Sequence, residues 1–332
     1  MRIIKIFFLF YLILSSGRVF ADNHDFNKWL ITFKTHALKQ GISEITIDTV
    51  MKNVKFLPKV IKYDRYQPEF YEDTKTYINK RTSKKKIDAG LELFFLNKKL
   101  INTIDKKFEV EKELLLALMG IETNFGAYLG KMNIISSLAT LSYDKRRSNF
   151  FTNELITILK LIDNNVIDYK ILFGSWAGAY GNFQFMPTTI QNYAIDYDRN
   201  NKIDLKSIND SFASAANYIN LIGWKKKQPC FSSIELNKNI PQKFLNTSAK
   251  KLKNKKKLKY FKKYIKNFEK LNINDNLTSA IITPDKDIVA DSNNLSPAYI
   301  VFDNYELILK WNRSLRFALA VCTLKNKFLN EL

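Results

Sequence analysis

The placement of glycine is the feature that most constrains how this chain can fold. The 332 residues contain only 10 glycines, and six of them fall in one stretch: Gly120, Gly126, Gly130, Gly174, Gly178 and Gly181. Glycine serves where a backbone must turn sharply or approach another group closely. The cluster therefore predicts loops of defined geometry in the middle of the chain, between segments that are almost free of glycine.

The flanking segments have the periodicity of helices. In residues 22–105, Phe26, Leu30 and Phe33 fall at helical spacing. Near the end of the chain, LILKWNRSLRFALAVCTL is one amphipathic pattern and predicts a single C-terminal helix. Two short apolar runs, AIITP and AYIVF, predict strands in or next to a Lys- and Asn-rich part that begins at Lys225.

The charge of the chain suggests a polymeric partner. Lys and Arg number 53 against 32 Asp and Glu, a formal charge of +21, which favours nucleic acid, a membrane or another anionic polymer. A hydrophobic fraction of 46% excludes global disorder. Two Cys and two His leave little material for a disulfide scaffold or a zinc centre.

The first 21 residues predict export. MRIIK forms a short basic region, IFFLFYLIL an apolar one, and SSGRVFA a polar stretch that ends in a small residue. This is the pattern of a signal peptide cleaved after Ala21, and the alternative is an uncleaved N-terminal anchor. Cleavage would remove Arg2, Lys5 and Arg18 and leave a charge of +18. Because an exported protein rarely meets nucleic acid, a basic nucleic-acid-binding protein becomes the weaker hypothesis.

One acidic residue lies at an unusual place in EKELLLALMGIETNFG. Glu122 shares a helical face with Leu115, Leu118 and Met119, and it sits at the predicted C-terminal end of that helix, before Gly126. An apolar face and the helix dipole both disfavour a carboxylate, so we expect a raised pKa, which suits a general acid. The alternative is a glutamate that reaches solvent or pairs with a lysine.

The segment FGSWAGAYGNFQFMPTTIQNYA combines flexible backbone with aromatic and polar groups. Pro187 marks the first turn of a following helix. The pattern favours a sugar-binding cleft over a phosphate cradle, because no GxxxxGK[ST] motif is present. The polar groups and flat faces are those of Ser175, Gln184, Trp176, Tyr180 and Phe185.

Taken in order, several motifs resemble the lytic murein transglycosylase B family. They are YDRYQPEF, KRTSKKKIDAG, GIETNFG, SSLATLSYDKRR, GSWAGAYGNFQFMPTT and SAANYINLIGW, and YELILKWNRSLRFALAVCTL is similar to the C-terminal segment of the family. The resemblance covers residues 62–224 well and 305–324 moderately. It implies a mainly α (α+β) fold, with a lysozyme-like helical catalytic core, additional N-terminal helices and a small strand-containing insertion.

The resemblance also implies a reaction. Glu122 matches the single catalytic glutamate of the family, which protonates the oxygen of the MurNAc–GlcNAc β-1,4 bond of peptidoglycan. The carboxylate then deprotonates the MurNAc 6-hydroxyl, which attacks C1 and leaves a 1,6-anhydro end. This chemistry needs no cofactor and no second carboxylate, unlike most glycosidases. A non-catalytic peptidoglycan-binding or scaffold protein of the same fold and a lysozyme-type hydrolase are the alternatives.

Other positions match the family one at a time. Arg146 and Arg147 match a basic pair beside the peptide stem, whose carboxylates suit an arginine fork. Trp311 stands where the family usually has Tyr, so the stacking face is kept and we expect the hydroxyl's hydrogen bond to be missing. Phe183 replaces a family Gly or Pro, and we expect it to narrow the groove. The resemblance places Ser175 near the N-acetyl group of the substrate. The matches to groove residues of the family are Ser175, Gln184, Tyr77, Tyr218, Phe185 and Asn312.

The segment DYDRNNKIDLKS predicts a structural calcium loop of the EF-hand type, which the resemblance supports. The Glu normally found at the twelfth position is replaced by Ser207, a loss of one acidic ligand. The alternative is an Asx-rich turn before the next helix. The candidate ligands are Asp196, Asp198, Asn200, the carbonyl of Lys202, and Asp204.

These inferences give a domain plan with defined boundaries. We expect a signal peptide (1–21), a helical domain with the catalytic core (22–224), a Lys-rich insertion with strands (225–300), and a C-terminal segment that returns to the core (301–332). The expected location is the periplasm, with peptidoglycan glycan strands as partner, no nucleic acid, no transmembrane segment in the mature chain, and other cell-wall enzymes as candidate protein partners. Export permits a disulfide between Cys230 and Cys322, but two cysteines alone do not establish one.

Overall fold

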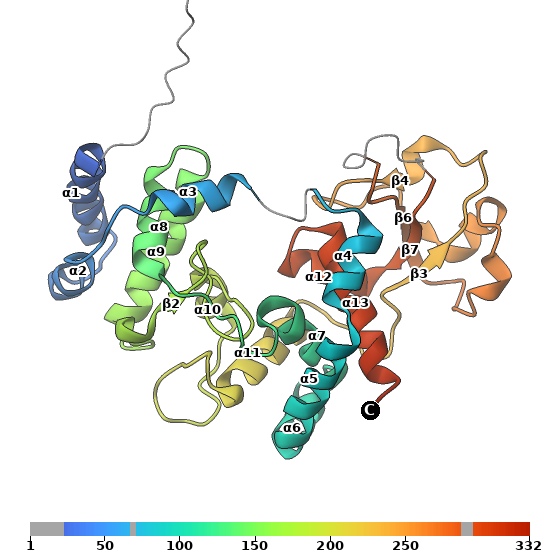
Figure 1. Cartoon of the computed structure of the whole chain (residues 1–332), viewed down its shortest axis with the longest axis horizontal. Coiled ribbons are helices and arrows are strands. Elements are labelled where there is room, and N and C mark those ends of the chain that lie inside the picture. The colour runs from blue at the N-terminus through green and yellow to red at the C-terminus, as the bar shows by residue number, and fades with distance from the viewer. Residues whose placement is uncertain (1–22, 67–70, 287–294) are drawn as a thin grey trace, which may run out of the picture.

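The computed structural model describes residues 23–66, 71–286 and 295–332 (Figure 1). The signal peptide predicted for residues 1–21 lies outside these described residues. The described part of the molecule is mainly helical, with one small sheet at one end and a two-stranded sheet near the other. The secondary structure confirms the predicted fold class, which is mainly α with a strand-containing insertion.

One end of the molecule is built from helices that are distant in sequence. α1 and α3 pack on α8, α2 packs on α9, and α9 packs on α8 and α10; this group lies on the left of Figure 1. Two short strands, β1 (Met132–Asn133) and β2 (Phe173–Gly174), pair antiparallel beside it. The helices are α1 (Asn23–Lys39), α2 (Glu44–Met51), α3 (Pro58–Arg65), α8 (Ile134–Tyr143), α9 (Ser148–Asp163) and α10 (Pro187–Tyr193).

The central helix is α7 (Lys112–Thr123), and it carries the predicted catalytic residue near its end. Every residue from Glu113 to Gly120 is buried, as is typical of a helix that is apolar all round and enclosed by others. α13, α5, α6 and α11 contact it. The helices of this group are α4 (Thr74–Arg81), α5 (Lys84–Leu96), α6 (Lys98–Phe108), α11 (Ile208–Leu221), α12 (Asp303–Trp311) and α13 (Leu315–Leu329).

The C-terminal pattern forms two helices where the sequence predicted one. α12 ends at Trp311, and the Oγ of Ser314 accepts a hydrogen bond from the Phe317 backbone N–H at 3.2 Å, which caps α13. Serine is a favoured N-cap because it satisfies a free N–H of the first turn. The Tyr305 hydroxyl donates to the Leu315 carbonyl at 2.7 Å and fixes the corner. The break places Trp311 at the end of a helix instead of inside one.

The insertion contains a five-stranded sheet, consistent with the two predicted strands. The order is β3-β7-β6-β4, with β5 also paired to β6; β4 runs parallel to β6 and the other pairs are antiparallel. The apolar runs form β6 and β7, which are almost entirely buried. The strands are β3 (Phe231–Ile234), β4 (Leu245–Asn246), β5 (Lys256–Lys257), β6 (Thr278–Ile282) and β7 (Ala298–Phe302).

A disulfide joins Cys230, just before β3, to Cys322 in α13, with the two Cα atoms 6.1 Å apart. The sequence left this pairing open, and the structure decides it. The bond ties the start of the insertion to the helix that packs along α7. The domain boundaries at residues 224 and 300 remain predictions. Among the described residues, no helix has the length and apolarity needed to cross a membrane.

Candidate active site

Glu122 lies in the last turn of α7, as the sequence predicted. The helix ends at Thr123, and Asn124 follows in the left-handed conformation with φ of 50°, a common way for a helix to end. The Thr123 hydroxyl donates to the Asn182 carbonyl at 2.8 Å and so ties this end of α7 to the glycine-rich segment. The side chain of Glu122 is partly exposed and lines a hollow.

The indole of Trp311 holds this carboxyl group. Its Nε1–H donates to Glu122 Oε1 at 2.9 Å. The exchange of tyrosine for tryptophan removes the hydroxyl, as expected, but a hydrogen bond is still made at this position because the indole supplies a donor of its own. The break between α12 and α13 makes this contact possible, since it leaves Trp311 at the end of α12.

Two of the aromatic residues predicted for the groove, Tyr218 and Trp311, stack together with Tyr193, which the sequence did not single out. The ring of Tyr218 lies between Trp311 and Tyr193, with centroids 5.0 and 4.3 Å away. Burial, followed by the effect of Tyr193, raises the pKa of Tyr218 to about 12, so its hydroxyl is neutral at physiological pH. That hydroxyl donates to the Lys310 carbonyl at 3.3 Å. The wall is therefore fixed to the same end of α12 that holds Glu122.

Two phenylalanines differ from the sequence-based expectation. Phe185 is 3% exposed and contacts the edges of Trp311 and Tyr218, so it supports the wall from behind and offers no open face for a sugar. Phe183 is 2% exposed and packs against Phe212 at 5.2 Å and Trp311 at 6.3 Å. The expectation that Phe183 narrows the groove is wrong, because its side chain turns into the core.

The glycine-rich segment folds into the tight loops that its composition predicts. Gly130 has φ of +83°, and a Cβ there would lie 2.1 Å from the Gly174 carbonyl oxygen, so only glycine lets the two loops approach. Ser175 Oγ accepts a hydrogen bond from the Ala179 N–H at 3.0 Å. The Gln184 amide donates to the Gly181 carbonyl at 2.8 Å. Both side chains are thus held in place by the loop that carries them.

Two adjoining hollows are lined by Glu122, Ser175 and Gln184, whereas Trp311 and Tyr218 line neither of them. One, of about 630 Å³, is lined by Tyr63, residues 126–132, Gly174–Trp176 and Gln184. The other, of about 390 Å³, contains Glu122. Tyr128 lines both hollows and is 74% exposed. Among the described residues that line them, Glu122 is the only carboxylate.

The wall of the hollow around Glu122 is basic, which the sequence analysis did not foresee. Lys80, Lys85 and Lys86 line it. Lys86 Nζ donates to the Gly120 carbonyl at 2.5 Å, at the end of α7, and burial, followed by the positive charge of Arg81, lowers the pKa of Lys86. The segment KRTSKKKIDAG carries these lysines, so the signal was present in the motif, but only the fold shows that the lysines face Glu122's hollow.

The basic pair predicted to lie beside the peptide stem binds a carboxylate of the protein itself. Arg146 Nε donates to Asp64 Oδ2 at 2.7 Å, and Arg147 binds the other oxygen of Asp64. Burial acts to raise the pKa of Asp64, but the bonds from Arg146 and Arg147 outweigh it and the pKa is lowered. The side chains of Arg146 and Arg147 remain about 40% exposed. Sequence reasoning missed Asp64, which lies next to Arg65 within YDRYQPEF.

The structure gives positions for two further predicted groove residues, Tyr77 and Asn312, but does not assign them a function. Tyr77 lies on α4, is 4% exposed, and has the Arg81 guanidinium 3.5 Å from its ring centroid. Asn312 follows α12 and is partly exposed. Their roles in binding remain predictions.

The acidic loop gathers a carboxylate set that differs from the predicted one. Oxygens of Asp196, Asp198 and Asp210 lie within 4.8 Å of one another. Asp204 instead accepts a hydrogen bond from the Tyr180 hydroxyl at 2.8 Å. Asn200 Oδ1 accepts from the Lys202 N–H at 2.9 Å within the loop. Sequence reasoning missed Asp210, because it lies beyond the loop in the first turn of α11.

Comparison with known proteins agrees with this geometry. The family model described as Transglycosylase SLT domain matches residues 25–326. The membrane-bound lytic murein transglycosylase B of Escherichia coli strain K12 is 37% identical over 127 residues. That alignment covers 38% of this chain and 35% of the relative, so it spans about a third of the relative's length.

Solved structures share the fold over nearly the whole chain. SltB3 from Pseudomonas aeruginosa, described in complex with NAG-anhNAM-pentapeptide, has a TM-score of 0.79 and 29% identity, over 92% of this chain and 79% of that one. Slt35 from Escherichia coli, described in complex with calcium, has a TM-score of 0.74 and 23% identity, over 94% and 95%. The lysozyme-like fold expected from the sequence motifs is confirmed.

Proposed function

The chain belongs to the Transglycosylase SLT domain family, and from this premise we propose that it is a lytic transglycosylase that cleaves the MurNAc–GlcNAc β-1,4 bond of peptidoglycan without water. The observation that carries the proposal is the set of residues around Glu122. Glu122 is the only carboxylate among the described residues that line the two hollows. Hydrolytic glycosidases of the usual type need two carboxyl groups. A single acid suits a reaction in which the substrate supplies the nucleophile.

Glu122 performs both proton transfers in this reaction. As the acid it protonates the glycosidic oxygen, and as the carboxylate it accepts the proton of the MurNAc 6-hydroxyl, whose oxygen attacks C1. Trp311 donates to Oε1 and cannot accept a proton, so the proton that Glu122 transfers belongs on Oε2. The C–O bond to the leaving sugar breaks as the bond from O6 to C1 forms, and the product ends in 1,6-anhydro-MurNAc.

The surrounding groups bind and orient the sugar chain. Ser175 and Gln184, held by their own loop, offer polar contacts to the N-acetyl and hydroxyl groups. Tyr218 and Trp311 supply the aromatic wall. Lys80, Lys85 and Lys86 line the hollow of Glu122 and give it a positive potential, which attracts the carboxylates of the peptide stem.

Digestion of purified sacculi by the full-length protein tests the proposal. Mass spectrometry of the soluble products is expected to show anhydro ends, one water lighter than the reducing ends that hydrolysis produces. Reducing MurNAc ends would assign the protein to the lysozyme-type hydrolases. Binding to sacculi without soluble products would establish the scaffold alternative. Glu122→Gln should abolish product formation, whereas Glu92→Gln, an exposed glutamate on α5, is the matched control and should not.

We also propose that the protein works in the periplasm. Peptidoglycan is accessible there, and the Cys230–Cys322 disulfide suits an oxidising compartment. The named Escherichia coli relative is described as membrane-bound. Cell fractionation with antibody detection tests the location, and the N-terminal sequence of the recovered protein tests cleavage after Ala21. Recovery from the cytoplasm with the N-terminus intact would contradict both.

A structural calcium ion in the acidic loop is a separate proposal. Asp196, Asp198 and Asp210 converge, and carboxylate oxygens are the ligands that Ca²⁺ prefers. Burial raises the pKa of Asp210 and the negative charge of Asp198 adds to the rise, although hydrogen bonds from the backbone N–H groups of Asp204 and Tyr197 act to lower it. A bound cation would offset the cost of burying this carboxylate. Added calcium should raise the melting temperature of the wild type and of Asp48→Asn, an exposed control on α2, but not that of Asp198→Asn. An equal rise in melting temperature for all three proteins would exclude this loop as the calcium-binding site.

A further inference from the structure

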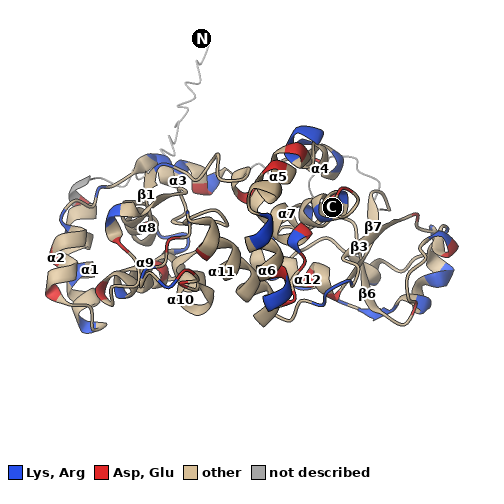
Figure 2. Ribbon diagram, turned by 90° about the horizontal axis from the view of Figure 1, so that it is seen from below, with Lys and Arg blue, Asp and Glu red and all other residues tan. Residues whose placement is uncertain are grey.

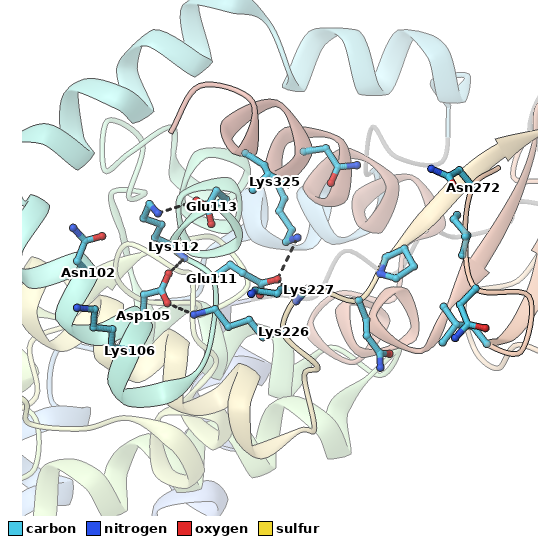
Figure 3. A pocket seen from close by; sticks show the side chains of 17 residues that line it. Asn102, Asp105, Lys106, Glu111, Lys112, Glu113, Lys226, Lys227, Asn272 and Lys325 are labelled. Carbon is cyan, nitrogen blue, oxygen red and sulfur yellow. Dashed lines mark hydrogen bonds and ion pairs between the residues drawn. The ribbon is translucent and has the colours of Figure 1, made fainter. Parts of the chain in front are cut away.

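A further cavity, of about 930 Å³, lies at the start of α7, at the end of this helix opposite Glu122. Figure 3 shows its lining residues. Residues of α6, the start of α7, the segment 226–229, the segment 272–277 and α13 line it. Glu113 lines this cavity and Glu122 lines the groove, and nine helical residues separate the two positions by roughly 14 Å along the axis. None of the residues that line this cavity lines either hollow of the candidate active site.

Part of the cavity wall is fixed by polar contacts, including those of the buried side chain of Glu111. Glu111 accepts hydrogen bonds from the Trp224 Nε1–H at 2.5 Å and the Lys227 backbone N–H at 2.8 Å, and it pairs with Lys325 at 3.4 Å. The side chains of Glu111 and Lys325 are each 8% exposed. Asp105 pairs with Lys226 and accepts from the Lys112 backbone N–H at 3.0 Å. These contacts join α6, α7, α13 and the segment after α11 around a preformed space.

The cavity has more cations than the protein neutralises. Five lysines line it against three carboxylates. Lys112, Lys226 and Lys325 pair with Glu113, Asp105 and Glu111 in turn. Lys106 and Lys227 are exposed, and neither has an ion pair among the described residues. Figure 3 shows both beside the ion-paired cluster. Two ammonium groups are therefore available to an anionic ligand.

The remaining lining favours a peptide over a simple anion. Five amide side chains contribute donors and acceptors of the kind that pair with peptide groups: Asn102, Gln228, Asn272, Asn274 and Asn326. Pro229, Ile273, Leu277 and Leu329 add apolar surface for small aliphatic side chains. The cavity volume of about 930 Å³ lies within the range of protein sites that bind drug-sized ligands. The matching ligand is a short peptide with small side chains and free carboxylates.

We propose that this cavity binds the carboxylate-bearing stem peptide of a peptidoglycan strand other than the one held at Glu122. The inference rests on the proposed function, because it takes its ligand from the same polymer. Two sites at opposite ends of one rigid helix let the enzyme hold a neighbouring strand while it cleaves another. Linking two weak sites in this way raises the overall affinity for a cross-linked wall without changing the affinity of either site.

Binding of a synthetic stem pentapeptide tests the proposal. The full chain carrying Glu122→Gln is titrated by calorimetry, and then the same chain with Lys106→Gln and Lys227→Gln. The matched control carries Lys28→Gln and Lys39→Gln, two exposed lysines on α1. We expect about tenfold weaker binding for the cavity variant and no change for the control. Equal affinities of the cavity variant and the control would overturn the proposal, as would binding of inorganic phosphate with the affinity of the peptide.

A photoreactive version of the peptide locates the site independently of affinity. Mass spectrometry should find cross-links in residues 102–113, 226–229, 272–277 or 325–329, and cross-links confined to the Glu122 groove would overturn the proposal. With Glu122 intact, the Lys106 and Lys227 variant should release fewer products from cross-linked sacculi and cleave peptide-free glycan strands at the wild-type rate. A wild-type protein that cleaves neither substrate would refute the proposed function instead, while the binding measurements would still test the cavity.

Discussion

At the scale of single residues, the indole at position 311 orients the carboxyl group of Glu122. A tyrosine hydroxyl can donate or accept a hydrogen bond, whereas the indole N–H only donates. Its contact with Oε1 therefore fixes that oxygen as the acceptor in both protonation states. The stack on Tyr218 and the edges of Phe183 and Phe185 hold the indole plane. In the proposed reaction, Trp311 is a positioning residue, which acts on the proton of Glu122 by fixing the orientation of the carboxyl group.

Replacement of Trp311 by Phe tests this role. Phenylalanine keeps an aromatic face but lacks the N–H, and a hydrogen bond to a charged group contributes about 1.5–3 kcal/mol. We expect kcat to fall roughly 10- to 100-fold with a smaller change in KM. Trp311→Tyr restores a donor and should recover part of the loss. A Trp311→Phe enzyme with the wild-type kcat would show that the contact does not serve catalysis.

The arginine cluster around Asp64 gives a prediction about pH. Because the pKa of Asp64 is lower in the folded protein than its usual value, its carboxylate stabilises the fold above the unfolded pKa of about 3.9, and this contribution disappears as the pH falls through the folded value. Asp64→Asn should cost about 1–3 kcal/mol of unfolding free energy at pH 7. The difference from the wild type should shrink below about pH 4. Urea unfolding of both proteins at pH 7 and below about pH 4 measures this difference in unfolding free energy. A difference that does not depend on pH would contradict its ionic origin.

At the scale of secondary-structure elements, local pattern determined what could be predicted. The apolar stripe that ends at Glu122 and the following glycine located the end of α7, and AYIVF located β7. The break after Trp311 was missed because the apolar periodicity of α12 and α13 continues across it, and the deciding interactions are the Ser314 cap and the Tyr305 hydroxyl bond.

Long-range contacts explain the remaining differences at the site. Asp64 and Arg146 are 82 residues apart, and Trp311 and Glu122 are 189 residues apart. No local period links such pairs. Phe183 and Phe185 flank Gln184 and both are buried, although the loop that carries them was expected to face the groove; the positive φ of Gln184 between them is not visible in the sequence pattern.

The disulfide between Cys230 and Cys322 connects two elements and gives a stability prediction. It closes a loop with a sequence separation of 92 residues, and cross-links of this kind typically contribute about 2–4 kcal/mol by restricting the unfolded chain. The double replacement of both cysteines by serine should lower the unfolding free energy by that amount. Reduction of the wild type should lower it similarly, and an unchanged urea midpoint in both cases would contradict a structural role.

At the scale of the whole molecule, positive charge is spread along the long axis. Figure 2 shows Lys and Arg on helices at one end and around the sheet at the other. Ten lysines lie between residues 250 and 266 in the insertion, away from the residues that line the Glu122 groove. This density reflects either a solvated basic surface or attraction to the carboxylates of the cell wall. The two explanations differ in their response to salt.

If the insertion attracts the wall, binding of the Glu122→Gln protein to sacculi should weaken as salt rises from about 0.1 M to about 1 M, because the screening length falls from about 10 Å to about 3 Å. Replacing Lys250, Lys251, Lys259 and Lys266 by Gln should weaken binding at low salt and flatten the salt dependence. The matched control replaces Lys28, Lys39, Lys52 and Lys55, four exposed lysines at the other end of the molecule. Equal losses in the two variants would assign the attraction to net charge and not to the insertion. Cleavage of peptide-free glycan strands should not depend on either set, since neither lines the Glu122 groove.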